Sequence, residues 1–441
     1  MIHVFRNEKN LLRGFGKKER GVISYKGFVF PEGDNVVELK GQGYVIFDAE
    51  IYNMPERHKS ERGYFRKLFT EDSPQTVTRK ANEWDGAWAI VYINPNGTLY
   101  AFTDPLGIKQ LYFNEAGEIC SRSMPIVSNF TDLDSQYRAS VYKWGYNTDD
   151  RTPWNHVKRV MPNVLYSFSG GRVLHKEFYE YYRWDKDIPT EDLKDVITKA
   201  IERRVKYFAG TQTDLLLSGG LDSSIVASVA FNFGRYMNLT TLANQGELEY
   251  AELMAKYLDA PLNKQEYYMD GIDFLNAILT NEGPVDLGSV VPQYKMFDTL
   301  AGRTIFTGDG ADELFGGYRR AKEYDSQRSD VFEELTFYHL PRIHKIAQAR
   351  SVTVCAPFLA QDVVKKALSL QRAERIDKIA LKNAFRDVIP TEILAREKKP
   401  LKNPELIENA KSYKNRVFET FYNEIIPTLQ KNVIEQHHEN L

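Results

Sequence analysis

The hydrophobic pattern of residues 20–110 is typical of antiparallel β-structure. Aromatic and β-branched residues occur in short runs, and Gly, Asn, Asp or Pro ends each run. We expect strands in GVISYKGFVF, GYVIFDAEIYN, GAWAIVYI and TLYAFTDP, and a helix in SERGYFRKLFTED. A further strand pair is expected in PNVLYSFSGGRVLHKEFYEYY, where Gly170 and Gly171 suit a two-residue hairpin turn. This part of the chain therefore predicts packed antiparallel sheets.

The pattern changes near residue 185. Apolar residues then recur at helical spacing, with Thr190 as the expected N-cap, at Leu193, Val196, Ile197, Ile201 and Val205. Beyond this helix, strand-like runs alternate with longer helical segments, which favours a parallel sheet, and the end of the chain is almost wholly helical. We therefore predict two domains, residues 1–185 and residues 186–441.

The composition agrees with two domains and excludes several classes of protein. A chain of 441 residues exceeds the length that one hydrophobic core usually serves. The net charge of −2 offers no general attraction to nucleic acid or to acidic membranes. Only two cysteines occur, Cys120 and Cys355, which are too few for a disulfide scaffold or a cysteine-rich zinc site. Without a signal-peptide core or a membrane-length apolar run, we expect a cytoplasmic protein that binds no nucleic acid and no membrane.

The stretch LLLSGGLDSS carries the first candidate chemistry. Leu215 to Leu217 are expected to form a buried parallel strand, residues 218–224 a turn, and Ile225 the start of a helix. A turn at the carboxyl end of such a strand, with two glycines, three serines and a helix N-terminus, suits a phosphate group. The lysine of the kinase-type phosphate loop is missing, and Asp222 would repel phosphate unless a divalent cation bridged them. Asp222 therefore predicts magnesium.

An ordinary strand-to-helix turn, capped by Asp222 or by a serine, is the alternative interpretation of this stretch. The full string SGGLDSS between an apolar strand and an apolar helix is much more specific than SGG alone. It resembles the loop of the ATP pyrophosphatases, enzymes that split ATP between its α and β phosphates and transfer AMP to a substrate oxygen. The bond that breaks is implied by this resemblance and not by the spacing.

A second stretch, TIFTGDGADELFGGY, joins an apolar strand to a glycine-rich turn that carries Asp309, Asp312 and Glu313. A solvated acidic turn would explain three scattered acids, and the spacing does not fit a calcium loop. Together with SGGLDSS, however, this stretch resembles the signature of the asparagine synthetase family. APFLAQDVVKKAL and KIALKNAFRDVIPTEILAREKKPLKNP are also similar to that family, most strongly from Lys378 onward.

The resemblance implies a fold for each domain. EIYN and DGAWAIVYINPNGTLYAFTDPLGIKQLYF resemble the glutamine amidotransferase domain that precedes the synthetase domain in that family. The expected fold is thus α/β plus α+β. It combines an N-terminal Ntn-hydrolase-like antiparallel β-sandwich with helices and a C-terminal parallel-sheet ATP pyrophosphatase domain of the adenine nucleotide α-hydrolase type.

The departures from the family pattern concern both domains. The amidotransferase class uses an N-terminal cysteine, but Ile2 follows Met1 here, and Asp48-Ala49-Glu50 replaces an Asn-Gly-Glu string that helps to hold an oxyanion. We therefore expect a degenerate amidotransferase domain without glutaminase activity, similar in this to β-lactam synthetase and lasso-peptide cyclase. In the synthetase domain, an Arg and an Asp of the family fall on Cys355 and Ala360, which weakens the case for aspartate as substrate.

The family resemblance also implies a role for each candidate residue. ATP would lie across the first loop, with Asp222 and Asp312 holding Mg²⁺. Lys398 would stabilise developing negative charge, and Asp309 would orient the incoming amine or take its proton. Lys378 and Lys382, four residues apart, are interpreted as charges on a helix surface. The residues expected to contact ATP are Leu217, Ser218, Gly219, Gly220, Leu221, Asp222, Ser223, Ser224, Ala243, Thr307 and Gly308.

Four functions follow from these observations. The first is an AMP-forming amide ligase that joins a small-molecule or peptide carboxylate to ammonia or an amine. The second is an ammonia-dependent asparagine synthetase. A tRNA-modifying pyrophosphatase would need basic patches or further cysteines, and an inactive scaffold would be expected to lose the loop acids, which remain. Whether the chain forms a homodimer is left open.

Overall fold

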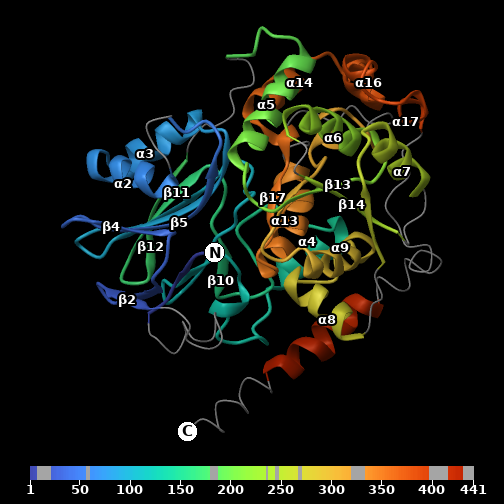
Figure 1. Ribbon diagram of the computed structural model, residues 1–441. Helices are drawn as coiled ribbons and strands as arrows, with labels where there is room; N and C mark the ends of the chain where they lie inside the picture. The colour runs from blue at the N-terminus through green and yellow to red at the C-terminus, as the bar shows by residue number, and fades with distance from the viewer. Residues whose placement is uncertain are drawn as a thin grey trace.

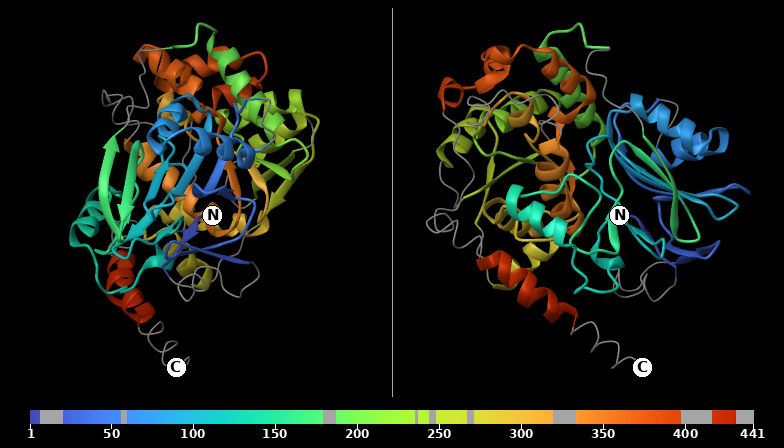
Figure 2. Two further views of the ribbon diagram at one scale, coloured as in Figure 1. Left: turned by 90° about the vertical axis from the view of Figure 1, so that its left-hand side faces the viewer. Right: turned by 180° about the vertical axis from the view of Figure 1, so that it is seen from behind.

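The computed structural model of this chain describes residues 1–6, 21–55, 60–178, 187–234, 237–243, 248–266, 271–318, 333–396 and 416–430. Two bodies of secondary structure pack side by side. The antiparallel sheets of the amino-terminal half lie on the left in Figure 1, and the parallel sheet with its helices lies on the right. The same division is visible from behind in Figure 2.

Antiparallel sheets build the amino-terminal half, as the sequence pattern predicts. The described sheets have the strand orders β1-β9-β8-β10, β12-β11-β7-β6-β5-β4 and β2-β3. Gly170 and Gly171, both at positive φ, form the predicted hairpin turn between β11 and β12. The strands are β1 (His3–Val4), β2 (Val22–Tyr25), β3 (Phe28–Pro31), β4 (Val36–Leu39), β5 (Gly43–Ile51), β6 (Gly86–Ile93), β7 (Leu99–Thr103), β8 (Tyr112–Asn114), β9 (Ile119–Cys120), β10 (Val157–Arg159), β11 (Val164–Ser169) and β12 (Arg172–Phe178).

Short helices cover the sheets of this half. The predicted helix is α2 (Glu61–Glu71), which begins after Ser60 because the Ser60 side chain accepts a hydrogen bond from the backbone N–H of Gly63. Phe65, Leu68 and Phe69 of α2 are buried against the strands. The other helices are α3 (Pro74–Lys80), η1 (Ala81–Glu83), η2 (Met124–Ile126) and α4 (Ser135–Trp144).

The carboxyl-terminal half is a parallel sheet between helices, as predicted. Its strand order is β15-β14-β13-β16-β17, with every pair parallel. The strands are β13 (Thr213–Leu216), β14 (Asn238–Leu242), β15 (Leu262–Gln265), β16 (Thr304–Phe306) and β17 (Thr353–Cys355). The helices are α5 (Leu193–Tyr207), α6 (Leu221–Phe233), α7 (Leu248–Tyr257), α8 (Gly271–Thr280), α9 (Leu287–Thr299), α10 (Ala311–Leu314), η3 (Leu335–His339), α13 (Leu340–Ala349), η4 (Pro357–Leu359), α14 (Gln361–Ser369), α15 (Arg372–Arg375), η5 (Ile376–Lys378), α16 (Ile379–Phe385), α17 (Thr391–Ala395) and η7 (Phe421–Ile425).

The predicted start of this half needs one correction. Helix α5 is capped by Asp192, whose side chain accepts a hydrogen bond from the backbone N–H of Asp195, and not by Thr190. Asp192 caps the helix because it immediately precedes Leu193, the first residue of the apolar helical repeat. From this position its side-chain oxygen reaches the unpaired N–H groups of the first turn. The predicted boundary near residue 185 lies outside the described residues and stays a prediction.

The strand order fixes where the two candidate loops meet. The chain leaves β13 toward β14 on one side and returns to β16 on the other side, so the connections diverge at the carboxyl ends of β13 and β16. Leu215 pairs with Phe306 in this register. Because parallel strands end at the same edge of a sheet, the residues that follow these two strands become neighbours, and such a point is where open α/β sheets bind ligands.

A shared core and a buried ion pair join the two halves. Ala87, Leu106 and Ile108 of the amino-terminal half belong to the same buried apolar cluster as α5 and α6. Beside this cluster, the Arg204 guanidinium donates to both carboxylate oxygens of Asp85, at 2.7 Å and 3.1 Å. The two side chains are 3% and 5% exposed, so each carries a charge that burial would otherwise penalise. The pair therefore ties α5 to the strands of the other half.

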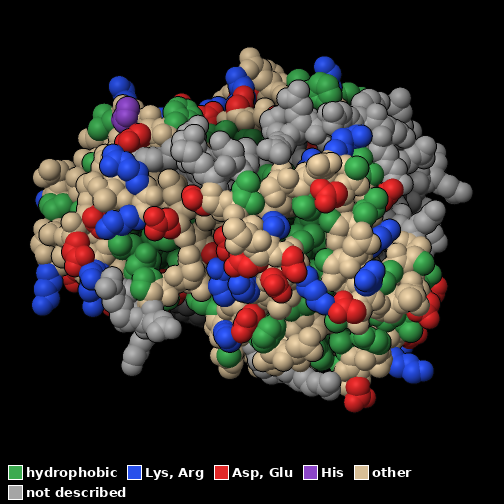
Figure 3. Space-filling model, turned by 90° about the horizontal axis from the view of Figure 1, so that it is seen from above, with side chains coloured by type: hydrophobic (Ala, Val, Ile, Leu, Met, Phe, Trp, Pro, Cys, Tyr) green, Lys and Arg blue, Asp and Glu red, His purple; other side chains and the backbone are tan. Residues whose placement is uncertain are grey.

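The lengths of the helices and the distribution of surface charge bear on membrane and nucleic-acid binding. Within the described residues, none of the helices combines the length and the apolar character that crossing a bilayer requires. On the face drawn in Figure 3, basic and acidic side chains are interspersed among polar and apolar ones. Cys120 and Cys355 are both buried and unbridged, as the cysteine count predicts.

The Asp85–Arg204 pair generates a stability prediction. Replacing Asp85 by Asn leaves a buried guanidinium without its counter-charge, so we expect the free energy of unfolding to fall by about 3–5 kcal/mol. A urea titration followed by circular dichroism measures the shift of the unfolding midpoint. The control is Lys194→Gln, which removes an exposed pair with Asp387 and should leave the midpoint unchanged. Equal midpoints for Asp85→Asn and the parent would contradict the role given to this pair.

Candidate functional site

The first loop runs from the end of β13 into α6, and its helix begins earlier than predicted. Helix α6 starts at Leu221, with Gly220 at the N-cap and no side chain bonded there, so the predicted start at Ile225 is wrong. The backbone N–H of Ser224 already donates to the Gly220 carbonyl at 3.1 Å. Asp222 therefore lies in the first helical turn, and neither it nor a serine caps the helix.

Serine hydroxyls and a glycine fix the shape of this loop. The hydroxyls of Ser218 and Ser223 lie 3.1 Å apart, and the Ser223 hydroxyl donates to the Gly220 carbonyl at 3.2 Å. Gly219 has a φ of +70°, and a Cβ there would come within 2.5 Å of the Ala251 nitrogen in α7. Only glycine fits this backbone position, because another residue would be both strained and blocked.

The second loop follows β16 and lies against the first. A Cβ on Gly308 would stand 2.7 Å from the Cβ of Asp222, so the missing side chain lets the two loops touch. Two residues later Gly310, at a φ of +91°, precedes the short helix α10, which carries Asp312 and Glu313. The loops of β13 and β16 thus bring Asp222 and Asp312 to one place, which their separation in sequence does not reveal.

A lysine from a third segment bridges these two carboxylates. The Lys378 ammonium lies 2.5 Å from Asp222 Oδ2 and 2.5 Å from Asp312 Oδ1. The Lys378 side chain is only 8% exposed. The interpretation of Lys378 as a surface charge is therefore wrong: it is the buried counter-charge of both acids.

Backbone geometry explains how Lys378 reaches this place. Asp377 and Lys378 have φ values of 56° and 58°, so the chain turns sharply before α16 and does not continue as one helix. The N–H of Lys378 donates to the Phe315 carbonyl at 3.1 Å, which docks this turn on the second loop. A Cβ on Gly317 would overlap both Asp312 Oδ1 and the Lys378 Cε. The i, i+4 spacing of Lys378 and Lys382 does not place them on one helix face, because Lys378 precedes the first residue of α16.

Glu313 and its partners form the far side of the second loop. Glu313 accepts a hydrogen bond from the Tyr318 hydroxyl at 2.6 Å, and His339 Nδ1 lies 3.4 Å away. Burial raises the pKa of the Glu313 carboxyl, and the nearby charge of Asp309 acts in the same direction. Asp309 itself is half-buried on the same loop. Glu313 thus anchors the loop, whereas Asp309 remains partly accessible.

Polar atoms without a partner mark this place as a ligand site. Among the described residues, Asp222 Oδ1, Ser224 Oγ and Thr307 Oγ1 are buried and have no hydrogen-bond partner. Such atoms are costly unless a ligand or an ion satisfies them. No cluster of three or more metal-ligating side chains occurs in the described ranges. Two carboxylates nevertheless fit Mg²⁺, which takes one or two from a protein and completes its shell with phosphate oxygens and water.

The remaining predicted residues are only partly placed at this site. Leu217, at the end of β13, donates its N–H to the Thr240 carbonyl of β14, and Ala243 directly follows β14. These two residues therefore lie at the same sheet edge as the loops. Lys398 is outside the described residues, so its assignment stays a prediction. Sequence reasoning missed the role of Lys378, which is the first residue of a stretch, Lys378 to Lys399, where the family resemblance is strong.

A second ion cluster lies in the amino-terminal half, around the Asp48-Ala49-Glu50 string. The Lys109 ammonium lies 2.8 Å from Asp48 Oδ1 and 3.0 Å from Glu50 Oε1. Burial raises the pKa of Glu50; it would also raise the pKa of Asp48, but Lys109 outweighs burial there and lowers it. Cys120 stands on β9, and burial raises the pKa of its thiol to about 11. The Cys120 thiol is therefore protonated at neutral pH, and the Lys109 ammonium is paired with both carboxylates.

Comparisons with known proteins agree with this geometry. The sequence model described as asparagine synthase matches residues 192–342 and 326–429. Asparagine synthetase [glutamine-hydrolyzing] 1 of Arabidopsis thaliana is 24% identical over 403 residues, 80% of this chain and 65% of that protein. Asparagine synthetase [glutamine-hydrolyzing] 1 of Bacillus subtilis is 26% identical over 345 residues, 70% of this chain and 52% of that protein. The chain thus spans less than two thirds of the length of these relatives.

The chain also resembles solved structures. An NH3-dependent NAD synthetase from Campylobacter jejuni covers 55% of this chain and 97% of its own, at 17% identity and a TM-score of 0.23. That score is too low to support a statement about fold or function. The asparagine synthase model, in contrast, covers more than half of the chain and includes both acidic loops and Lys378. The protein belongs to the asparagine synthase family.

Proposed function

We propose that this protein is an AMP-forming amide ligase. It would use ATP to adenylate a substrate carboxylate, release pyrophosphate and transfer the acyl group to ammonia or an amine. The observation that carries the proposal is the buried cluster of Asp222, Lys378 and Asp312 at the divergence point of β13 and β16. A buried cation between two carboxylates suits a site that must take up a polyphosphate together with its metal ion.

The first loop would bind the nucleotide. Leu217 and Ala243 would flank the adenosine at the sheet edge, and the turn of Ser218, Gly219 and Gly220 would approach the phosphates. Helix α6 supports this assignment because its first N–H groups point toward the loop, and its positive end attracts an anion. Leu221, Ser223 and Ser224 contribute from the first helical turn, and Thr307 and Gly308 close the site from the second loop.

Asp222 and Asp312 would hold Mg²⁺ through oxygens that lie around Lys378. When bound, the ion would neutralise the negative charge that develops on the departing pyrophosphate. The unpartnered, buried Asp222 Oδ1 supports this assignment. Lys378 would then turn from the carboxylates toward the phosphate oxygens, because its charge is no longer needed between the acids. This exchange of partners would couple nucleotide binding to the closing of the two loops.

Asp309 and Lys398 would act on the second half of the reaction. Asp309 is the acid of the second loop that is partly accessible and not bonded in the Lys378 cluster, which suits a group that orients the amine or accepts its proton. Lys398 would stabilise the negative charge that develops as the amide forms. The adenylated intermediate must be kept from water, so the loops are expected to close over it.

The amine would come from solution and not from glutamine hydrolysis. The Cys120 thiol is fully buried beside His3, and its raised pKa keeps it protonated at neutral pH. Asp48 would place an anion where the amidotransferase reaction needs oxyanion donors, and Lys109 already occupies that carboxylate. The amino-terminal half would therefore serve as a wall of the synthetase and not as a second enzyme.

Ammonia-dependent asparagine synthesis is the second candidate, and family membership favours it. Against it, Cys355 and Ala360 are fully buried at the positions where the family resemblance expects an arginine and an aspartate. Burial raises the pKa of the Cys355 thiol to about 12, so it offers no charge to an amino-acid substrate. A different carboxylate is therefore the better proposal.

The role of Asp222 predicts loss of nucleotide cleavage. Asp222→Asn keeps the size of the side chain but removes a metal-binding charge, so AMP and pyrophosphate release should fall by at least about 100-fold. The assay supplies Mg-ATP, ammonia and a panel of carboxylates. Asp387→Asn, which removes an exposed carboxylate, is the control and should match the parent. An Asp222→Asn variant as active as the parent would refute the mechanism.

The placement of Lys378 predicts competition with the metal ion. Lys378→Met removes the ammonium between the two acids, so Mn²⁺, used as a spectroscopic substitute for Mg²⁺, should bind the free protein at least about 10-fold more tightly. Electron paramagnetic resonance measures free Mn²⁺ directly. AMP release should fall in the same variant because the phosphates lose their cation. Weaker Mn²⁺ binding in Lys378→Met would show that Lys378 does not compete for these carboxylates.

The role of Asp309 predicts a separation of the two half-reactions. Asp309→Asn should leave ATP–pyrophosphate exchange within about threefold of the parent, because adenylation does not need a base. Amide formation should fall by about 100-fold or more, the size of a general-base contribution. Both rates are measured on the same preparation with the same carboxylate. If exchange and amide formation fell together, Asp309 would belong to nucleotide binding instead.

A further inference from the structure

A cavity lies between the two halves of the molecule, outside the cluster of Asp222, Lys378 and Asp312. Its volume is about 50 Å³, and it opens to solvent. The amino-terminal half contributes the segment between α4 and β10, and the other half contributes η3, the start of α13 and the link between α8 and α9. Neither half forms this pocket alone.

Six charged side chains and four tyrosines line the pocket. Its cations are Arg151, Arg159, Arg342 and Lys345, and its carboxylates are Asp149 and Glu282. Three of the cations are already neutralised: Lys345 pairs with Glu282 at 2.7 Å, Arg342 pairs with Asp286, and Arg151 pairs with Asp149. Their charges are therefore committed to the wall itself.

Arg159 is the exception. It is 8% exposed, its Nη2 donates to the Thr336 carbonyl at 3.1 Å, and its guanidinium stands 5.0 Å from the centre of the Phe337 ring. Within the described ranges, no carboxylate lies at ion-pair distance from it. Burial accordingly lowers the pKa of the Arg159 guanidinium. A buried cation without a counter-ion is costly, so a bound anion would stabilise this arrangement.

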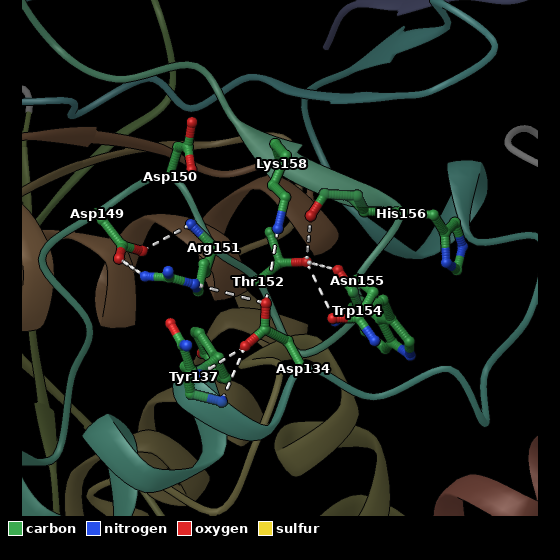
Figure 4. A network of polar contacts seen from close by, with 12 residues as sticks. Asp134, Tyr137, Asp149, Asp150, Arg151, Thr152, Trp154, Asn155, His156 and Lys158 are labelled. Carbon is green, nitrogen blue, oxygen red and sulfur yellow. Dashed lines mark hydrogen bonds and ion pairs between the residues drawn. The ribbon is translucent and has the colours of Figure 1, made fainter.

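The carboxylates nearest to the pocket are each fixed by a cation other than Arg159. Glu282 and Asp286 have φ values of 63° and 46°, a conformation that non-glycine residues rarely adopt. On the other wall, Figure 4 shows Arg151 between Asp149 and Asp134, and Lys158 also points to Asp134. These carboxylates are thus paired with other cations, and Glu282 favours the charge of Arg159 only from beyond ion-pair distance.

The pocket also adjoins the second acidic loop. Tyr338 and Arg342 line it, and His339, which follows Tyr338, stacks on the ring of Tyr318 with 5.5 Å between ring centres. Burial opposes the charge of Arg342, but Asp286 first and then Tyr338 and Asp309 raise its pKa. A ligand in the pocket would therefore stand close to the loop that carries Asp309 and Asp312.

We propose that this pocket between the halves binds an organic carboxylate, with Arg159 as its anchor. One uncommitted guanidinium matches one carboxylate, whereas a phosphate dianion would need more free cations than the wall offers. Tyrosines 112, 137, 146 and 338 surround the rest of the space, and they suit an organic body with polar groups. The carboxylate is either a remote group of the substrate or part of a separate effector.

The test measures binding to the full chain directly, so it does not depend on the proposed reaction. Isothermal titration calorimetry would compare glutarate, its uncharged analogue glutaramide and inorganic phosphate. Glutarate should bind the parent, and glutaramide should not. Arg159→Gln should weaken glutarate binding by at least about 10-fold, the loss expected for a charged hydrogen bond. The charge-matched control, Arg386→Gln on the exposed end of α16, should bind like the parent.

A second variant covers the case in which Arg159→Gln does not fold. Val285→Phe adds a ring to the pocket wall without touching Arg159, and it should also weaken glutarate binding by at least about 10-fold. The proposal is overturned if no carboxylate binds the parent, if both variants bind glutarate like the parent, or if phosphate binds more tightly through Arg159.

A further arm separates the two sources of the carboxylate. With Mg-ATP and ammonia present, AMP release that depends on glutarate and on Arg159 would identify a substrate group. Binding of glutarate without AMP release would identify a separate effector site. Either result supports the pocket. Failure of the proposed ligase reaction would appear instead as absent AMP release with every carboxylate while glutarate still binds.

Discussion

The buried cluster of Asp222, Lys378 and Asp312 is the constraint on which the rest of the site depends. Two carboxylates that face each other inside a protein repel, and a cation must stand between them. Three distant segments meet to satisfy this condition: the loop after β13, the loop after β16 and the turn before α16. Gly308 and Gly317 permit the approach because a Cβ at either position would collide with members of the cluster. A divalent metal ion would meet the same electrostatic demand and could hold a polyphosphate beside the two acids, which is why we propose nucleotide chemistry for this cluster.

The hydrophobic pattern predicts the class of each half, because strand and helix periods follow directly from which residues face the core. The hairpin turn at Gly170 and Gly171 was predictable for a local reason. A two-residue hairpin turn needs both residues at positive φ, which glycine adopts readily. Lys378 was not. The spacing to Lys382 suggests a helix face only if the helix is continuous, and the turn at Asp377 and Lys378 breaks it. The predicted start of α6 at Ile225 was wrong because the N-cap residue is Gly220. Glycine has no side chain that could cap the helix, so the sequence gives no capping signal at this position.

The amino-terminal half contacts the carboxyl-terminal half through a buried ion pair and a shared pocket. Asp85 binds Arg204 across the boundary, and Lys109 pairs with Asp48 and Glu50, where the family resemblance implies a string that helps to hold an oxyanion. No local pattern predicts such contacts, because Asp85 and Arg204 stand 119 positions apart and Lys109 and Glu50 stand 59 positions apart. The pocket around Arg159 belongs to the same interface, with walls from both halves. In the proposed function, the amino-terminal half shapes the space beside the synthetase loops and does not hydrolyse glutamine.

The most direct measurement of the central claim is the identity of the nucleotide product. Phosphorus NMR of a reaction with Mg-ATP, ammonia and a panel of carboxylates distinguishes cleavage between the α and β phosphates from cleavage between the β and γ phosphates. The account predicts AMP and pyrophosphate in equal amounts, formed only when a carboxylate is present. ADP and inorganic phosphate as the products would contradict it.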